Sequence, residues 1–175
     1  MLTVAMPHLS LSRTAVHQAL GELMVDAVPA HLRTVTPRLV CKDAKAAIAF
    51  YQKAFGAEQL GEVFTMPDGK IVHAELRIGD SVMFVTDENE DGNGTSPGVL
   101  GGVSVIIALS VPDADAWWAR AMDAGASVVY PIEDQFYGDR GGRVADPFGH
   151  QWMISTHIED VDPEELDRRM KEFMS

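Results

Sequence analysis

The amino-acid sequence predicts an α+β fold in which one βαβββ unit occurs twice. The pair Gly56-Ala57, at the end of a helical pattern, recurs as Gly125-Ala126, and the hairpin glycine Gly79 recurs as Gly149. Both recurrences have a period of about 70 residues, which is typical of a repeated supersecondary unit. One such unit cannot bury both faces of its sheet, so we expect the two units to form one cup-shaped mixed sheet. Its helices would lie outside and a cleft inside.

Three parts are expected along the chain: an N-terminal extension at residues 1–33, a paired βαβββ domain at 34–157 and a C-terminal helix at 158–175. Ser12 can cap a helix over residues 13–27, where apolar residues recur at three- and four-residue steps, and Pro29 ends it. This extension either lies on the domain, packs on a partner subunit, or reflects a start codon placed upstream of Met6 or Met24.

The first module is expected at about residues 34–87. Residues 34–40 carry β-branched side chains and predict a strand, and Asp43 opens a helix that Gly56 ends. Strands follow at 57–65, 71–78 and 81–86, separated by turn residues around Gly69 and Gly79. Residues 87–101 are polar and rich in glycine, which predicts a connector.

The second module is expected at about residues 102–157. A strand at 103–110 precedes a helix that begins at Pro112-Asp113 and ends at Gly125, and strands follow at 127–132, 142–145 and 151–156. The segment 146–150 predicts a structural hairpin, with Asp146 accepting backbone N–H groups and Gly149 at positive φ. Trp152 is expected in the core. Asp162-Pro163 starts a last helix, which runs to about Phe173.

Composition excludes several classes of protein. The chain has 175 residues, a net charge of −12 and one cysteine, Cys41, so neither a disulfide framework nor a cysteine-based zinc site can form within it. The acidic balance argues against nucleic acid as a partner and permits a cationic ligand. No apolar stretch is long enough to span a membrane and no signal peptide is recognised, so a cytoplasmic protein is expected.

Three segments resemble the vicinal-oxygen-chelate superfamily, which includes glyoxalase I, bleomycin-resistance proteins and extradiol dioxygenases. They are residues 43–57, residues 73–80 and the closing motif at 146–152. Within the superfamily the chain looks most like the PhnB-like branch. The resemblance, over about residues 35–157, implies a homodimer and a small-molecule site on the inner face of the sheet.

Metal-dependent members of that superfamily bind one divalent ion through four inner-face side chains. The ion chelates two adjacent oxygens of the substrate or intermediate and acts as a Lewis acid. By register, this chain offers Thr36, Glu75, Ile106 and Met153 at those places. Only Glu75 is a competent ligand, so no cofactor is expected. A slip of two residues would bring in His73, Arg38, Ser104 and Gln151, and a weak metal site at His73 and Glu75 stays open as an alternative.

Five further interpretations concern single residues. Glu75 has two interpretations. It faces the cleft, as a general base or as the partner of a cationic ligand, or it pairs with Arg77 or Arg38 and has a structural role. His73 lies two residues away on the same face of the strand. In the resembling family the loop at 133–142 borders the cleft mouth. Phe136 and Tyr137 could therefore stack on a planar ligand, while Arg140 could close over an anion or pair with Asp139 or Asp134.

Two functions remain in competition, with a structural or interaction module as a third. The first is a metal-free small-molecule binder of the bleomycin-resistance type, with Thr36, Arg38, Ile106, Phe136, Tyr137, Arg140 and Met153 lining a cleft between the modules. The second is a glyoxalase-like lyase or isomerase that uses Glu75 and His73, with or without a divalent metal. Whether the protein is an enzyme stays open at this point.

Overall fold

The computed structural model describes residues 26–89 and 94–175. The chain divides into two units, residues 1–34 and 35–175, and the second holds both modules and the C-terminal helix. Residues 26–34 form turns and bends. The helix expected over residues 13–27 lies outside the described residues except for its last two positions.

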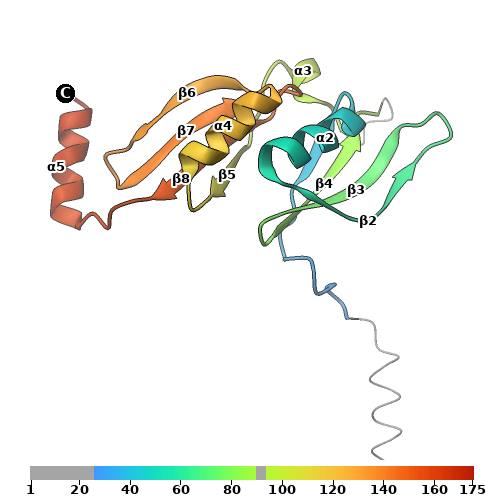
Figure 1. Ribbon diagram of the computed structural model, residues 1–175, viewed down its shortest axis with the longest axis horizontal. Coiled ribbons are helices and arrows are strands. Elements are labelled where there is room, and N and C mark those ends of the chain that lie inside the picture. Colours follow the sequence, from blue (N-terminus) through green and yellow to red (C-terminus); the bar gives the residue numbers. More distant parts are fainter. Residues whose placement is uncertain (1–25, 90–93) are drawn as a thin grey trace, which may run out of the picture. The chain divides into compact units, whose positions relative to one another are not determined.

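Module 1 is a four-stranded mixed sheet with one helix across it (Figure 1). Its elements are β1 (Arg38–Cys41), α2 (Ala44–Phe55), β2 (Glu58–Thr65), β3 (Ile71–Ile78) and β4 (Ser81–Asp87). The strand order is β1-β4-β3-β2, with β1 parallel to β4 and the other pairs antiparallel. Asp43 caps α2 by accepting from the Ala46 N–H, and Gly56 ends it at φ 65°.

Module 2 repeats this arrangement after a connector that contains the short helix α3 (Pro97–Leu100). Its elements are β5 (Ile106–Ser110), α4 (Ala114–Ala124), β6 (Ser127–Asp134), β7 (Asp139–Ala145) and β8 (Gln151–His157). The order β5-β8-β7-β6 matches that of module 1, and β5 is parallel to β8. Asp113 caps α4 and Gly125 ends it, as Asp43 and Gly56 do for α2.

The predicted α+β fold of two βαβββ modules is confirmed, with differences in detail. β5 begins at Ile106 rather than at residue 103, and β6 runs to Asp134 rather than to residue 132. The sheet is built as two separately hydrogen-bonded halves. β1 begins at Arg38, because Pro37 has no N–H to donate to the ladder, although its carbonyl still accepts from Phe84. β7 begins at Asp139 rather than at residue 142. Asp139 already pairs with His157 of β8, and this antiparallel pairing continues through Gly141 and Gly142, so both glycines belong to the strand.

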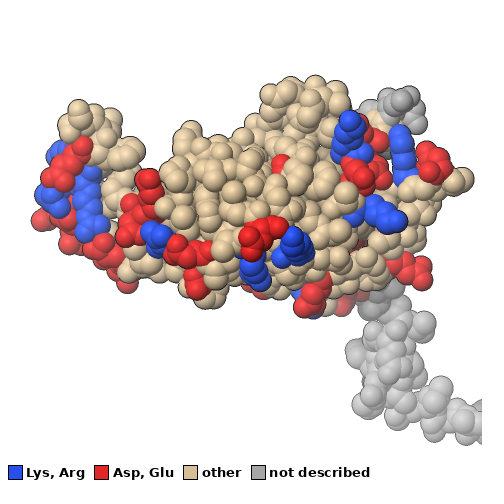
Figure 2. All heavy atoms as spheres, turned by 45° about the horizontal axis from the view of Figure 1, so that its top comes forward, with Lys and Arg blue, Asp and Glu red and all other residues tan. Residues whose placement is uncertain are grey.

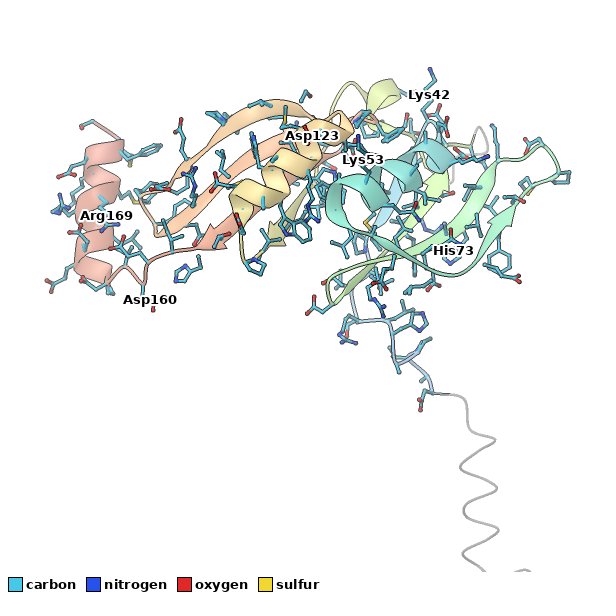
Figure 3. The ribbon with its side chains drawn as sticks, viewed as in Figure 1. Lys42, Lys53, His73, Asp123, Asp160 and Arg169 are labelled. Atoms are coloured by element: carbon cyan, nitrogen blue, oxygen red, sulfur yellow. The ribbon has the colours of Figure 1, made fainter. Side chains whose placement is uncertain are left out.

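The core lies where the helices meet the two sheets. Helices α2 and α4 contact each other, and the Lys53 ammonium on α2 donates to the Asp123 carbonyl at 2.6 Å (Figure 3). The Phe55 and Trp152 rings lie 4.8 Å apart, and Trp152 is fully buried as expected. Burial is uneven, since α2 buries seven residues and α4 buries only Ala114 and Ala121.

Asp146 accepts four hydrogen bonds, and the one from Tyr51 joins module 2 to α2 of module 1. Its Oδ2 accepts from the Tyr51 hydroxyl of α2 at 2.7 Å and from the Trp152 indole at 2.9 Å. Its Oδ1 accepts from the Phe148 and His150 backbone N–H groups, both at 2.9 Å, and Gly149 has φ 92°. The expected structural hairpin is therefore present, and Asp146 also fixes α2 to it.

The C-terminal helix α5 (Pro163–Phe173) is held by ion pairs and one aromatic stack. Arg169 pairs with Glu159 and Glu165 and lies against the Phe136 carbonyl. The Phe173 ring stacks on Phe136 at 5.1 Å. Figure 2 shows Lys and Arg side chains interleaved with Asp and Glu along this helix. Because no residue of α5 is buried, the helix depends on these surface contacts.

The segment before α5 contains a histidine between two carboxylates. His157 Nδ1 lies 2.9 Å from Asp139 and Nε2 lies 2.9 Å from Asp160. These hydrogen bonds, first to Asp139 and then to Asp160, raise the pKa of His157 above 6.5. The stabilisation is thus fully present below pH 6.5 and is lost as the pH rises through the higher pKa of the folded state.

We expect an NMR titration of His157 to give a pKa above 6.5 in the folded protein, and Asp160→Asn to lower it because one charged acceptor is removed. A pKa at or below 6.5, or one that Asp160→Asn leaves unchanged, would contradict the described contacts.

Candidate functional site

Each sheet has one face covered by its helix and one open face. In β3, Ala74, Leu76 and Ile78 are buried and lie toward α2, whereas the intervening His73 and Glu75 are only partly buried. In β7, a side chain added at Gly142 would meet Trp118 of α4, so the neighbouring Arg143 lies on the open face. The candidate site residues can therefore be assigned to faces.

The open face of module 1 brings together a histidine, a carboxylate and two aromatic rings. His73 Nε2 lies 3.2 Å from Glu75 Oε1, with the two side chains 27% and 22% exposed. The His73 ring lies 4.8 Å from the Phe84 ring and 6.1 Å from that of Phe64, which is 57% exposed. The guanidinium of Arg38 lies over Phe84 at 5.8 Å.

This arrangement gathers Arg38, His73 and Glu75 of the sequence-predicted residues on one surface. Arg77, one expected partner of Glu75, instead pairs with Glu58. A carboxylate beside an imidazole can accept a hydrogen bond from a donor group of a ligand, or take up a proton, and the rings offer faces for stacking.

Two hollows border β1. One, of about 360 Å³, is lined by polar groups that include Arg38, Lys70 and Asp87. The other, of about 280 Å³, lies between β1 and the chain leading into β5, and is lined mainly by apolar residues together with Arg38 and His150. Of the residues predicted to line a cleft between the modules, Arg38 lines this second hollow. Thr36 lies two residues before Arg38 and is partly buried.

The open face of module 2 holds Ile106 and Met153, and also a residue that the sequence reasoning did not select. Met153 pairs with Ala108 on one side and with Arg143 on the other. The Arg143 guanidinium lies 4.9 Å from the centre of the Tyr130 ring. Ile106 begins β5 and is 42% exposed.

The strand register corrects one part of the sequence reasoning. Phe84 pairs with Arg38 and Glu75, just as Met153 pairs with Ala108 and Arg143. Phe84 is therefore the repeat counterpart of Met153, and Glu75 is the counterpart of Arg143. The expected set of four metal-ligand positions took Glu75 from β3 of module 1 but Met153 from β8 of module 2, and these two places are not equivalent in the repeat. The sequence alone does not show which residues pair across strands, so it could not reveal this mismatch.

The chemistry of these positions does not fit a divalent metal. Phe84 has no donor atom, and the Met153 thioether is a soft donor that hard cations do not favour. Over residues 26–89 and 94–175, no group of three or more His, Cys, Asp or Glu side chains is placed to hold a metal ion. These positions therefore support no reaction step at a metal ion.

The remaining predicted residues lie elsewhere. Phe136 and Tyr137 form an edge-to-face pair, and Phe136 is covered by Phe173 of α5. Arg140 lies on the helix-facing side and pairs with Asp115 of α4 and with Asp134. Figure 3 shows His73 in module 1 and α5 at opposite ends of residues 35–175. A single pocket holding His73, Met153 and Phe136 is thus not formed within one chain.

Cys41 is not a nucleophile in this structure. It is fully buried, and burial together with the Asp146 charge raises the pKa of its thiol to about 12. The thiol therefore stays protonated near neutral pH.

Comparisons with known proteins agree with this fold. A family model described as "Glyoxalase/Bleomycin resistance protein/Dioxygenase superfamily" matches residues 30–154. The uncharacterized protein Rv0887c of Mycobacterium tuberculosis is 44% identical over 158 residues, 88% of this chain and 90% of that protein. The crystal structure of TioX from Micromonospora sp. ML1 is 27% identical with a TM-score of 0.58, covering 72% of this chain and 99% of that one. The structure of the Arabidopsis thaliana At5g48480 product is 31% identical with a TM-score of 0.55, covering 70% and 97%.

Proposed function

The chain belongs to the glyoxalase/bleomycin resistance protein/dioxygenase superfamily, and we propose that it is a metal-free member that binds a planar, cationic small molecule on the open face of module 1. The observation that carries this proposal is the grouping of Glu75 with the His73, Phe84 and Phe64 rings. The rings offer stacking surfaces and Glu75 offers a charge partner. The net charge of −12 favours the approach of a cation.

Three finer points belong to the same proposal. The closing motif at 146–152 supports placement in the PhnB-like branch. A homodimer is proposed from the family resemblance. A cytoplasmic location is proposed from the sequence. Among the described residues, no helix is long and apolar enough to cross a membrane.

We expect Glu75→Gln to weaken binding of a planar cationic dye such as proflavine about tenfold, because the exchange removes the charge while keeping the size of the side chain. Fluorescence titration at low and at high salt measures the loss. Glu62→Gln is the matched control, since Glu62 is an exposed carboxylate on β2 of the same module. Equal affinity in both variants, or no saturable binding by the wild-type protein, would exclude this site.

Elemental analysis is expected to find less than one divalent ion per chain in protein purified without chelators and without a metal-affinity tag. The physical reason is the donor set, in which Phe84 and Met153 occupy equivalent places on β4 and β8. Zinc added back to the protein should leave its melting temperature unchanged. A stoichiometric metal that is lost in Glu75→Gln would contradict the metal-free proposal.

The second candidate function is a glyoxalase-like lyase or isomerase with Glu75 as the general base. The hydrogen bond between His73 and Glu75 favours it, since such a pair can hold and pass a proton. Incubation with methylglyoxal and a thiol separates the two functions. Turnover that Glu75→Gln abolishes supports the enzyme, whereas a ligand that stabilises the protein without being consumed supports the binder.

A further inference from the structure

Arg143 lies in the interior of module 2's sheet, and the residues directly opposite it on the two neighbouring strands are uncharged. Across the strands it meets Met153 on β8 and Tyr130 on β6. Along β7 the residues of the same face are Gly141 and Ala145, two positions away in each direction. Glu133 lies on β6 opposite Gly141, on the same face, but among the described residues no ion pair joins its carboxylate to Arg143.

The guanidinium also lacks a partner from the rest of the described chain. Arg77, Arg140, Arg168 and Arg169 each pair with at least one carboxylate. For Arg143 the described residues provide the Tyr130 ring face and neither a hydrogen bond nor an ion pair. Its Nε is buried without an acceptor. Leaving such a donor unpaired destabilises the folded state, so the site is energetically incomplete.

The residues around Arg143 leave room above the sheet. Ala145 and Ala108 are small, and Met153 presents a flexible apolar side chain, whereas Ser155 of β8 fills the space at Gly141. The Tyr130 ring orients the guanidinium plane, which reduces the entropy lost when an oxyanion binds it through two hydrogen bonds. A flat apolar group attached to that oxyanion could rest on the small residues and on Met153.

We propose that the open face of module 2 is a second ligand site, which binds the carboxylate of a small planar organic acid through Arg143. This site takes the opposite charge from the proposed site at Glu75, and it rests on its own observations. The position that carries Glu75 in module 1 carries Arg143 in module 2, so the two repeats present opposite charges from equivalent places.

Benzoate is the test ligand, with benzamide as its neutral counterpart of the same shape. NMR of the Arg143 Nε–Hε group in the full-length protein should show a saturable shift with benzoate and none with benzamide. Arg143→Gln should weaken benzoate binding at least tenfold, and Arg143→Lys should weaken it less, because lysine keeps the charge but loses the two-point contact. Inorganic phosphate in a parallel titration shows whether the site prefers a carboxylate.

Arg120→Gln is the matched control. Arg120 also lies over an aromatic ring, that of Trp117 at 4.6 Å, but it belongs to the exposed side of α4. Its loss should leave benzoate affinity unchanged. Glu75→Gln should also leave benzoate affinity unchanged. The two proposals are therefore tested separately, because a failure of dye binding at Glu75 would not affect the benzoate result.

Two results would overturn the proposal. One is equal binding of benzoate by the wild-type protein and Arg143→Gln, or no binding by either. The other is a change of molecular mass in solution in Arg143→Gln, measured by light scattering, with benzoate affinity unaltered. That second outcome would show that Arg143 contacts a second copy of the chain instead of a ligand.

Discussion

Asp146→Asn is expected to lower the free energy of unfolding by about 3 kcal/mol. The amide keeps one acceptor oxygen for the Phe148 and His150 N–H groups, but its NH₂ replaces the oxygen that accepts from Tyr51 and Trp152. The Trp152 indole can only donate, so two donors would face each other in a buried site. Urea unfolding followed by tryptophan fluorescence measures the loss.

Asp113→Asn is the control for this substitution. Asp113 is an exposed helix cap that accepts from the Ala116 N–H, and asparagine caps helices about as well as aspartate. Its stability should change by less than about 0.5 kcal/mol. If Asp146→Asn behaves like Asp113→Asn, the four hydrogen bonds do not fix α2 to module 2 as described.

Gly138→Ala is expected to release the C-terminal segment. Gly138 has φ 97°, and a Cβ there would lie 2.1 Å from the Glu159 carbonyl oxygen. The Gly138 carbonyl also accepts from the Ile158 and Glu159 N–H groups. We expect a cost of at least about 2 kcal/mol, enough to raise the open population of this segment about thirtyfold. Limited proteolysis between residue 158 and α5 should accelerate accordingly.

Gly69→Ala separates backbone strain from steric conflict. Gly69 has φ 90°, close to that of Gly138, but no atom lies within 4 Å of the added Cβ. It should cost only about 1 kcal/mol and leave proteolysis of the C-terminal segment at the wild-type rate. An unchanged cleavage rate in Gly138→Ala would mean that the segment does not pack on the turn at residue 138.

Local signals made most of the fold predictable. Asp43 and Gly56 mark the ends of α2 through their own backbone chemistry, and Asp113 and Gly125 do so for α4. The alternation that places Trp152 in the core is also readable from β8 alone. Each of these features depends on residues within a few positions of one another.

The candidate site was less predictable because it depends on contacts between distant segments. Phe84 and Arg143 join it through cross-strand register, which no single strand specifies. Phe136 was expected at a cleft mouth, but Phe173 of α5 covers it, and only the docking of that helix decides this. The first half of β7 was not predicted from the sequence, because Gly141 and Gly142 belong to a residue type that is depleted in strands.

Amide protons of module 2 are expected to exchange with solvent through more frequent local openings than those of module 1. The reason is that α2 buries seven side chains, whereas α4 buries two. Tyr130 and Arg143 thus belong to the less protected half of residues 35–175. A ligand held across β6, β7 and β8 would slow exchange there while leaving α2 unchanged, so binding at this face would act mainly by ordering the half that opens first.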